Sequence, residues 1–359
     1  MKMADKKRQL EELRKKLSEI DRALLERLEE RARASRDIRA LLEGEAPALD
    51  RSEAEGLDAL ATASGGVLPE ESLRAIFSEI FAVGRALEQP VRVAYLGPEG
   101  GFCHAVAQAQ FGVGTSFLEC ATVVEALDEV ERGRAVYAVF PFESSVEGLV
   151  QPSINALEQT DLVLVAERAM PATYSLMSRT ENIADIDKIF ATAAAHAACE
   201  RFLERELAKV SVIDVRSPVV AAEMCADDHG GAALVPEPAG RAQGLGVVRA
   251  NIGDTADMRF RYGVAGARPA SRSGNDTTCL LFSVDDAPGA LYDVLRHFAE
   301  RGINLKKLQS RPVSGQGWDY VFFAEVTGHV TDRAVVTALE AIKRSTKYLR
   351  VLGSFATAE

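Results

Sequence analysis

A glycine-rich turn is the first feature of the sequence that could do chemistry. In residues 91–104, VRVAYLGPEGGFCH, an apolar run typical of a strand ends at Gly97, Pro98 and Gly100, and Phe102 opens a helical segment. Glycines keep side chains away from a ligand, and the N-terminus of a helix offers free N–H groups to an anion. The turn is therefore a candidate carboxylate or phosphate site, and the alternative is a turn that binds nothing.

A second helix start has similar chemistry. Pro288 and Gly289 precede an apolar helical run that ends at Gly302. The free N–H groups at the beginning of that helix can receive the carboxylate of a small ligand.

Composition limits the classes of function. The chain has 359 residues, 47% of them hydrophobic and 26% charged, which is enough for two or three domains. The formal net charge of -11 argues against nucleic acid or an anionic membrane as a partner. Five scattered cysteines and five histidines without ligand spacing predict no metal, no cofactor and a reducing, cytoplasmic location. A highly charged N-terminus and the lack of an apolar run of about 20 residues predict neither a signal peptide nor a membrane span.

Residues 1–90 have the pattern of a helical segment. Apolar residues from Leu10 to Leu28 recur at steps of three and four, which predicts one long amphipathic helix before the break at Gly44. A second helix is expected from Asp50 to about Ala63 and a third from Pro69 to about Leu87. The long helix has more apolar surface than two short helices can cover, so we expect helices of a second copy to cover the rest.

Strands and helices alternate in residues 91–266. Strands are expected near 115–118, 135–140, 162–167, 188–191, 210–215 and 232–235, with a return strand at 258–264, and helices near 123–131, 152–157, 194–207 and 219–226. This alternation predicts a mostly parallel sheet, here in two α/β lobes with a ligand cleft between them.

The C-terminal part begins with a linker. Residues 267–276, ARPASRSGND, are polar and rich in small residues. Residues 277–359 then follow the order strand, helix, strand, strand, helix, strand, which is typical of a ferredoxin-like module.

Each of the three segments contains a family motif. These are LRKKLSEIDRALLERLEER in the first, a Gly-Pro-x-Gly turn in the second, and Gly-Ala-Leu with Gln-Ser-Arg-Pro in the third. Together, in this order, they resemble the bifunctional chorismate mutase–prephenate dehydratase family. The resemblance implies an all-α three-helix mutase-like domain at 1–90, an α/β two-lobed periplasmic-binding-protein-like domain at 91–266, and an α+β ferredoxin-like ACT domain at 277–359. It also implies a homodimer or higher oligomer.

The mutase-like segment has part of the family's site. The resemblance implies cationic side chains that hold a dianion and stabilise charge developing at its ether oxygen. Arg14 and Arg31 stand where the family has two arginines on its first helix. Leu42 occupies the place of a further cation, on the face of Arg31, and Arg39 lies about 80° around the helix from that face.

Two other helices contribute to the same site in the family. Asp50 keeps the aspartate at the start of helix two, and Glu88 aligns with a polar residue near the end of helix three. Glu53 and Ala54 replace an Arg-Glu pair. We therefore expect reduced mutase activity.

The dehydratase-like segment keeps the family's substrate-binding opening at Gly97, Pro98, Gly100 and Phe102, whereas Gly101 replaces a hydroxyl residue.

Further dehydratase motifs imply catalytic roles for Glu143, Ser144 and Ser145, which stand where the family has Glu-Asn-Ser, and for Arg259 and Phe260. The guanidinium of Arg259 suits a carboxylate. In contrast, Met258 replaces a threonine and Thr192 lies in an altered Ser-His-Pro stretch. A thioether cannot donate a hydrogen bond to a departing hydroxyl. The alternative for the polar residues is structural: a strand-end charge, two turn residues and a surface ion pair.

The C-terminal module resembles the amino-acid-sensing ACT domain. Its motifs are Gly289-Ala290-Leu291 and Gln309-Ser310-Arg311-Pro312, where Gln309 replaces a glutamate. The resemblance implies an allosteric site for L-phenylalanine, and the alternative is a dimer contact.

The resemblance as a whole implies phenylalanine biosynthesis. The expected reactions are chorismate to prephenate, an isomerisation, and prephenate to phenylpyruvate, a lyase reaction, with feedback by L-phenylalanine. Two alternatives remain. One is a catalytically weak, phenylalanine-responsive regulator or scaffold. The other is an enzyme that decarboxylates prephenate without dehydrating it, which the loss of a donor at Met258 favours.

Overall fold

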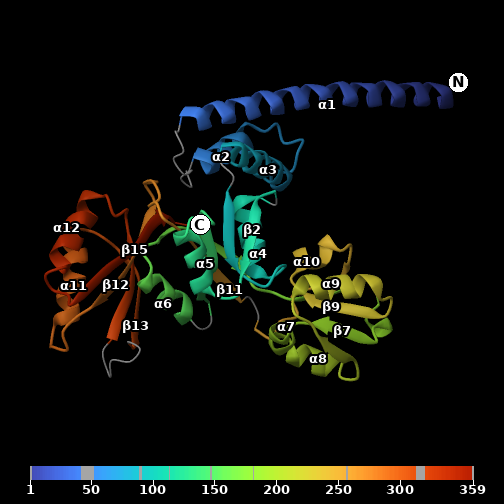
Figure 1. The fold of residues 1–359 in the computed structure, drawn as a ribbon. Coiled ribbons are helices and arrows are strands. Elements are labelled where there is room, and N and C mark those ends of the chain that lie inside the picture. Colours follow the sequence, from blue (N-terminus) through green and yellow to red (C-terminus); the bar gives the residue numbers. More distant parts are fainter. Residues whose placement is uncertain are drawn as a thin grey trace. The chain divides into compact units, whose positions relative to one another are not determined.

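The computed structural model describes residues 2–41, 52–88, 91–112, 114–145, 148–180, 182–255, 258–312 and 320–357. The chain divides into two compact units (Figure 1). The first consists mainly of three helices, and the second contains two β-sheets.

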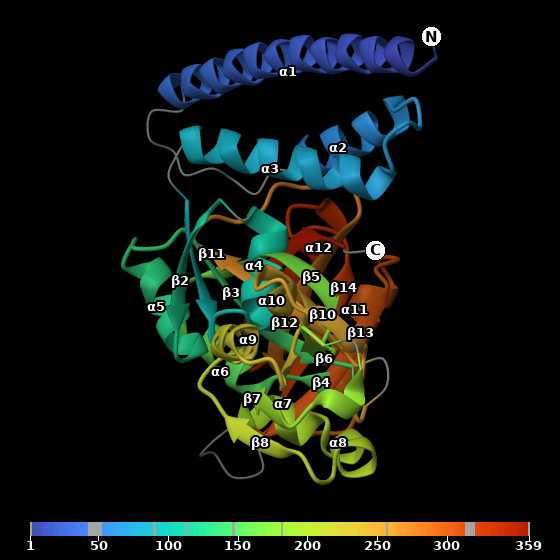
Figure 2. The same cartoon turned by 90° about the vertical axis from the view of Figure 1, so that its right-hand side faces the viewer.

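The helical unit is formed by α1 (Lys2–Leu41), α2 (Ser52–Ala63) and α3 (Glu70–Glu88). Helix α1 is continuous in both views (Figures 1 and 2), as the apolar periodicity predicted. Helix α3 packs against α1 and α2, and its Leu73 and Ala82 are buried. The apolar stripe of α1 is uncovered, since its leucines and isoleucine from Leu10 to Leu28 are 43–60% exposed. The two shorter helices therefore do not cover the long one, as expected.

The second unit begins with an α/β lobe. Its strands run in the order β5-β11-β3-β1-β2, with β4 beside β3. They are β1 (Arg92–Leu96), β2 (Ser116–Cys120), β3 (Tyr137–Ser144), β4 (Gly148–Leu149), β5 (Val163–Pro171) and β11 (Arg259–Gly266). The helices are α4 (Phe102–Phe111), α5 (Val123–Glu131) and α6 (Gln151–Gln159). Strands β1 and β3 are parallel, whereas the return strand β11 lies antiparallel between β3 and β5.

The second lobe is built on a five-stranded sheet in the order β10-β6-β9-β7-β8. Its strands are β6 (Ser175–Ser178), β7 (Lys188–Ala191), β8 (Ser211–Asp214), β9 (Gly231–Val235) and β10 (Gly246–Arg249). Its helices are η1 (Ile183–Asp185), α7 (Ala193–Ala198), α8 (Glu200–Glu206), α9 (Pro218–Asp227) and α10 (Glu237–Ala242). Strand β7 pairs in parallel with β8 and β9, as predicted from the alternation. Beyond β9, β6 and then β10 continue the sheet as antiparallel strands.

The helix expected at 194–207 is divided into two. Cys199 has φ -127° and ψ 18°, so it ends α7 and precedes α8. The segment around Asp254 satisfies the backbone groups that this break frees. The N–H of Asp254 donates to the carbonyl of Ala198 at 2.7 Å, and its carboxylate accepts from the N–H of Arg201 at 3.0 and 3.1 Å.

The C-terminal module has the predicted βαββαβ order. Its elements are β12 (Asp276–Ser283), α11 (Ala290–Ala299), β13 (Leu305–Pro312), β14 (Tyr320–Thr327), α12 (Arg333–Ile342) and β15 (Tyr348–Ala356). Helices α11 and α12 cover one face of its sheet (Figure 1). Strand β15 joins this sheet to β5 at Gly353, where a Cβ would come within 2.1 Å of the carbonyl oxygen of Leu164. Only glycine allows that approach.

Candidate active site

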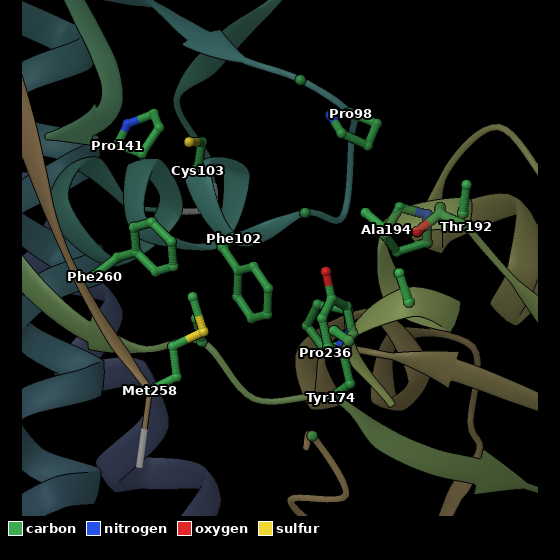
Figure 3. Close-up of a pocket in the computed structure, with 18 of the residues that line it drawn as sticks. Pro98, Phe102, Cys103, Pro141, Tyr174, Thr192, Ala194, Pro236, Met258 and Phe260 are labelled. Carbon is green, nitrogen blue, oxygen red and sulfur yellow. The ribbon is translucent and has the colours of Figure 1, made fainter. Parts of the chain in front are cut away.

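A cavity of about 770 Å³ lies at the junction of the two lobes of the second unit (Figure 3). Its lining is mainly apolar and comes from segments far apart in the sequence, among them the glycine-rich turn, the starts of α4 and α7, the end of β8 and the start of β11. The expected cleft between two α/β lobes is therefore present.

The glycine-rich turn forms one wall of the cavity. Gly97, Pro98 and Phe102 line it, and so does Gly101, whereas Gly100 does not. The turn must contain glycine, because a Cβ at Gly97 would lie 2.7 Å from the side chain of Glu119, and Gly100 has φ +75°.

The N–H groups of this turn are bonded within the turn and its surroundings. The N–H of Glu99 donates to Glu119 Oε2 at 2.9 Å, that of Gly100 to His104 Nδ1 at 3.1 Å, and that of Gly101 to the carbonyl of Pro98 at 3.0 Å. These three donors are engaged within the protein, so the turn contributes shape to the cavity wall.

Two aromatic side chains face each other in the cavity. Phe102 and Tyr174 meet edge to face with ring centroids 5.2 Å apart, and the hydroxyl of Tyr174 is directed into the cavity (Figure 3). Burial raises the pKa of Tyr174 to about 12, so its hydroxyl is a protonated donor at neutral pH. The thiol of Cys103 is also held protonated, because burial raises its pKa to about 12.

Strand β11 presents alternate residues to the cavity. Met258, Phe260 and Tyr262 line it, and side chains one residue apart on a strand point to opposite faces. Arg259 and Arg261 are accordingly outside the lining. The structure does not bring the expected Arg259 to the cavity.

Arg261 is the centre of a charged cluster on the other face of β11. Its Nη1 lies 2.6 Å from Glu143 and 2.8 Å from Glu325, and its Nη2 contacts Glu167. Burial opposes the charge of Arg261, but the surrounding carboxylates outweigh it and raise the pKa of the guanidinium.

Glu143 is engaged in this cluster and also pairs with Lys307 of β13. Ser144 is buried, and Ser145 is exposed and accepts a hydrogen bond from the N–H of Arg259 at 3.0 Å. These three expected catalytic residues lie together at the end of β3, outside the cavity lining.

Several lining residues were missed by the sequence analysis. They include Tyr174 and three charged residues, Asp214, Arg216 and Asp254. Asp214 and Arg216 could have been found, because they occur where the predicted parallel strand β8 ends, and ligands gather at such ends. Tyr174 precedes a short strand that the sequence pattern did not reveal.

In the helical unit, only part of the expected site is described. Arg31 donates from Nη1 to the carbonyl of Ile80 at 3.0 Å and lies over the ring of Phe81, so it joins α1 to α3. Arg14 is exposed on α1. Leu42 and Asp50 lie outside the described residues, as do the side chains of Arg39, Glu53, Ala54 and Glu88, whose backbones are helical.

In the C-terminal module, the two expected effector motifs lie on different elements. Gly289, with φ +87°, caps α11, which begins with Ala290 and the half-buried Leu291. Gln309 and Arg311 of β13 face the first lobe. Gln309 lies beside Gly148, and Arg311 contacts α6.

The other two residues of that motif lie on the same strand. Ser310 is exposed, and Pro312 ends β13 with its side chain outside the described residues.

Among the described residues, no group of three or more histidine, cysteine and acidic side chains could hold a metal ion. None of the helices described is sufficiently long and apolar to cross a membrane.

Three family models match the chain in sequence order. Chorismate mutase type II matches residues 13–89, prephenate dehydratase matches residues 93–270, and the ACT domain matches residues 279–344.

Individual proteins are similar over most of the chain. A bifunctional chorismate mutase/prephenate dehydratase from Aquifex aeolicus is 36% identical, covering 97% of this chain and 98% of the relative. The crystal structure of a prephenate dehydratase in complex with L-Phe from Arthrobacter aurescens is 32% identical with a TM-score of 0.62, over 75% of this chain and 90% of that chain. The structure of GqqA, described as a novel type of quorum quenching acylase, is 26% identical with a TM-score of 0.62, over 74% of this chain and 98% of that chain.

Proposed function

The chain belongs to the family of bifunctional chorismate mutase/prephenate dehydratases, and on that premise we propose that it converts chorismate to prephenate and prephenate to phenylpyruvate, with L-phenylalanine as feedback effector. We assign the mutase to residues 1–90, the dehydratase to 91–266 and effector binding to 277–359. A cytoplasmic location is supported by the five cysteines, all of which are free and buried.

The observation that carries the dehydratase assignment is the cavity between the lobes. It is lined by residues of the family's opening turn and of its later motif, including Gly97, Phe102 and Phe260. Concave, mostly apolar cavities at a junction, with a few polar groups, are the usual sites for small substrates.

The chemistry of the lining fits a dehydrating decarboxylation. The bond from the ring to its carboxylate carbon breaks, CO₂ leaves, and the electron pair enters the ring as it becomes aromatic. The ring hydroxyl departs with a proton as water, and this departure needs a hydrogen-bond donor. The protonated hydroxyls of Tyr174 and Thr192 line the cavity and can supply the donor that Met258 lacks.

A different reaction is suggested by the similarity to GqqA. Acyl transfer through a covalent intermediate needs an activated nucleophile. The thiol of Cys103 lines the cavity, but burial raises its pKa to about 12, which leaves it a poor nucleophile. We therefore favour the dehydratase.

For the mutase, we propose Arg14, Arg31, Arg39, Asp50 and Glu88 as the polar groups of the site. The uncovered stripe of α1 supports a homodimer in which partner helices pack on it. Light scattering on the purified chain tests the dimer.

For the effector, we propose that L-phenylalanine binds at the start of α11 and beside β13. The similarity to a dehydratase solved with L-Phe supports this choice. Because Gln309 and Arg311 face the first lobe, we propose that a second copy of the module completes the site.

Product identification by mass spectrometry, with chorismate and prephenate supplied separately, tests the proposal. Phenylpyruvate from both substrates is the expected result. A decarboxylated product that keeps the hydroxyl would identify the non-dehydrating alternative, and L-phenylalanine binding without turnover would identify the regulator.

A further inference from the structure

Among the described residues that line the cavity, one side chain is cationic. Of its lining residues, all in the described part of the chain, three are charged: Asp214, Arg216 and Asp254. We propose that Arg216 holds the 2-oxo carboxylate of the substrate, an inference that rests on the proposed dehydratase function. A dianion in a cavity whose other charges are negative needs a cation to hold it.

The other arginines near the cavity are directed elsewhere. Arg259 and Arg261 occupy the face of β11 opposite to the lining residues Met258, Phe260 and Tyr262. Arg261 is also fully engaged with three carboxylates. Neither can bind a ligand in the cavity without a reversal of the strand.

Arg216, in contrast, is available. It is exposed, and it makes no hydrogen bond or ion pair with the described residues. Its backbone is fixed, because it follows β8 and precedes Ser217, whose Oγ accepts from the N–H of Val220 at 3.3 Å and caps α9. All five guanidinium donors are therefore free of partners in the part of the chain that the structure describes.

The two acidic side chains that line the cavity do not pair with Arg216. The carboxylate of Asp254 accepts two bonds from the N–H of Arg201, and no ion pair joins Asp214 to Arg216. A carboxylate that enters the cavity can therefore form a bidentate pair with Arg216.

The reaction selects which of the two substrate carboxylates Arg216 holds. Decarboxylation moves the electron pair of the ring carboxylate into the ring, so a cation at that group would stabilise the ground state more than the transition state. The 2-oxo carboxylate keeps its charge throughout and is still present in phenylpyruvate. Held by Arg216, it anchors the molecule, while the ring carboxylate lies among apolar side chains such as Phe102 and Phe260.

Binding of the product, phenylpyruvate, separates this role from a structural one. By calorimetry, Arg216→Gln should weaken phenylpyruvate binding about tenfold to a hundredfold, as expected for loss of a charged hydrogen-bonded partner. Arg216→Lys should lose less. The methyl ester of phenylpyruvate, which lacks the charge, should bind wild type and Arg216→Gln equally. The matched control is Arg205→Gln, which changes an exposed arginine of α8 in the same lobe. This variant should bind both ligands as wild type does.

Kinetics with prephenate give a second readout. Arg216→Gln should raise KM by about tenfold to a hundredfold and change kcat much less, because the anchored charge is the same in ground and transition states. Unchanged KM and unchanged phenylpyruvate affinity in Arg216→Gln, or a loss seen instead in Arg259→Gln, would overturn the inference. If wild type does not turn over prephenate, the proposed function fails, and the binding experiment still tests Arg216.

Discussion

The guanidinium of Arg311 on β13 is paired with the carboxylate of Glu158 on α6. Arg311 is 5% exposed and also contacts the side-chain oxygen of Asn155. On the same helix, Ser153 donates to the carbonyl of Pro141 at 2.5 Å, and Pro141 lines the cavity. A residue of the expected effector motif is thus connected through α6 to a wall of the candidate active site.

Glu158→Gln should weaken communication between effector and substrate. The amide keeps the shape but loses the charge opposite Arg311, so we expect the coupling free energy to fall by about 0.5–2 kcal/mol. The measurement is the change in prephenate KM that saturating L-phenylalanine produces. Glu340→Gln, at an exposed position of α12, serves as control. Equal coupling in wild type and Glu158→Gln would show that α6 does not carry it.

The pair between Glu143 and Lys307 explains why the sequence alone could not assign a role to Glu143. Glu143 lies near the end of β3 and precedes two serines, a pattern that fits catalysis and a structural charge equally well. Its partner lies 164 positions further along the chain. Only the tertiary structure brings them together, so local pattern could not choose between the two roles.

Other features were readable from the sequence. Strand and helix order followed from periodicity, and the same period of two on β11 already implies that Arg259 faces away from Met258 and Phe260. The break at Cys199 was not readable, because it depends on hydrogen bonds that Asp254 donates to Ala198 and accepts from Arg201. Short strands such as β6, which has four residues, contain too few positions to establish a period.

Tyr174→Phe should reduce the dehydratase kcat by about 10²-fold or more, because it removes a donor to the departing hydroxyl.

The pH profile of the wild-type kcat gives a further check on the role of Tyr174. The pKa of Tyr174 is raised to about 12, so its protonated donor form persists at higher pH than that of an ordinary tyrosine. The kcat should therefore show no loss from this group as the pH rises from 8 to about 10.5. A fall centred near the ordinary tyrosine pKa would contradict the assignment.

Met258→Thr should increase phenylpyruvate formation. The substitution places a hydroxyl in the cavity wall, at a position where the thioether cannot donate. Met258→Leu, which adds no donor, is the control and should leave the rate unchanged within about twofold. The measurement is the rate of phenylpyruvate formation, followed by absorbance, in wild type and in both variants. No gain in Met258→Thr would mean that the hydroxyl-bearing residues already present are sufficient.

The mutase rate should rise when the missing polar groups are restored. Leu42→Lys restores the cation that the family has at this place in the sequence, and loss of such a group typically costs about 10²–10³ in rate. Glu53→Arg with Ala54→Glu restores the pair on helix two. Chorismate consumption by the triple variant should exceed that of wild type, and Lys16→Leu, a change of charge at an exposed position of α1, should have no effect. Brisk turnover by wild type would show that Arg39 already supplies the cation.

L-phenylalanine should bind the C-terminal module and raise the melting temperature of the chain. The ligand should raise the free energy of unfolding by RT ln(1 + [L]/Kd), which is about 2.7 kcal/mol when its concentration is a hundred times Kd. Gly289→Val should abolish the shift. A Cβ there would meet no atom within 4 Å, but φ is +87°, a conformation that a β-branched residue resists, so the start of α11 would be remodelled.

Gly274→Val is a matched control for this prediction. Gly274 also has φ +87° and open space around its Cβ, but it lies in the linker before β12. Both variants therefore carry the same local strain, and only Gly289→Val should lose the ligand. Gln309→Glu should keep the shift, because the side chain retains its length and faces the first lobe. If calorimetry detects no L-phenylalanine binding at millimolar ligand, the sensor assignment is wrong, and β12 to β15 serve only as a contact between copies.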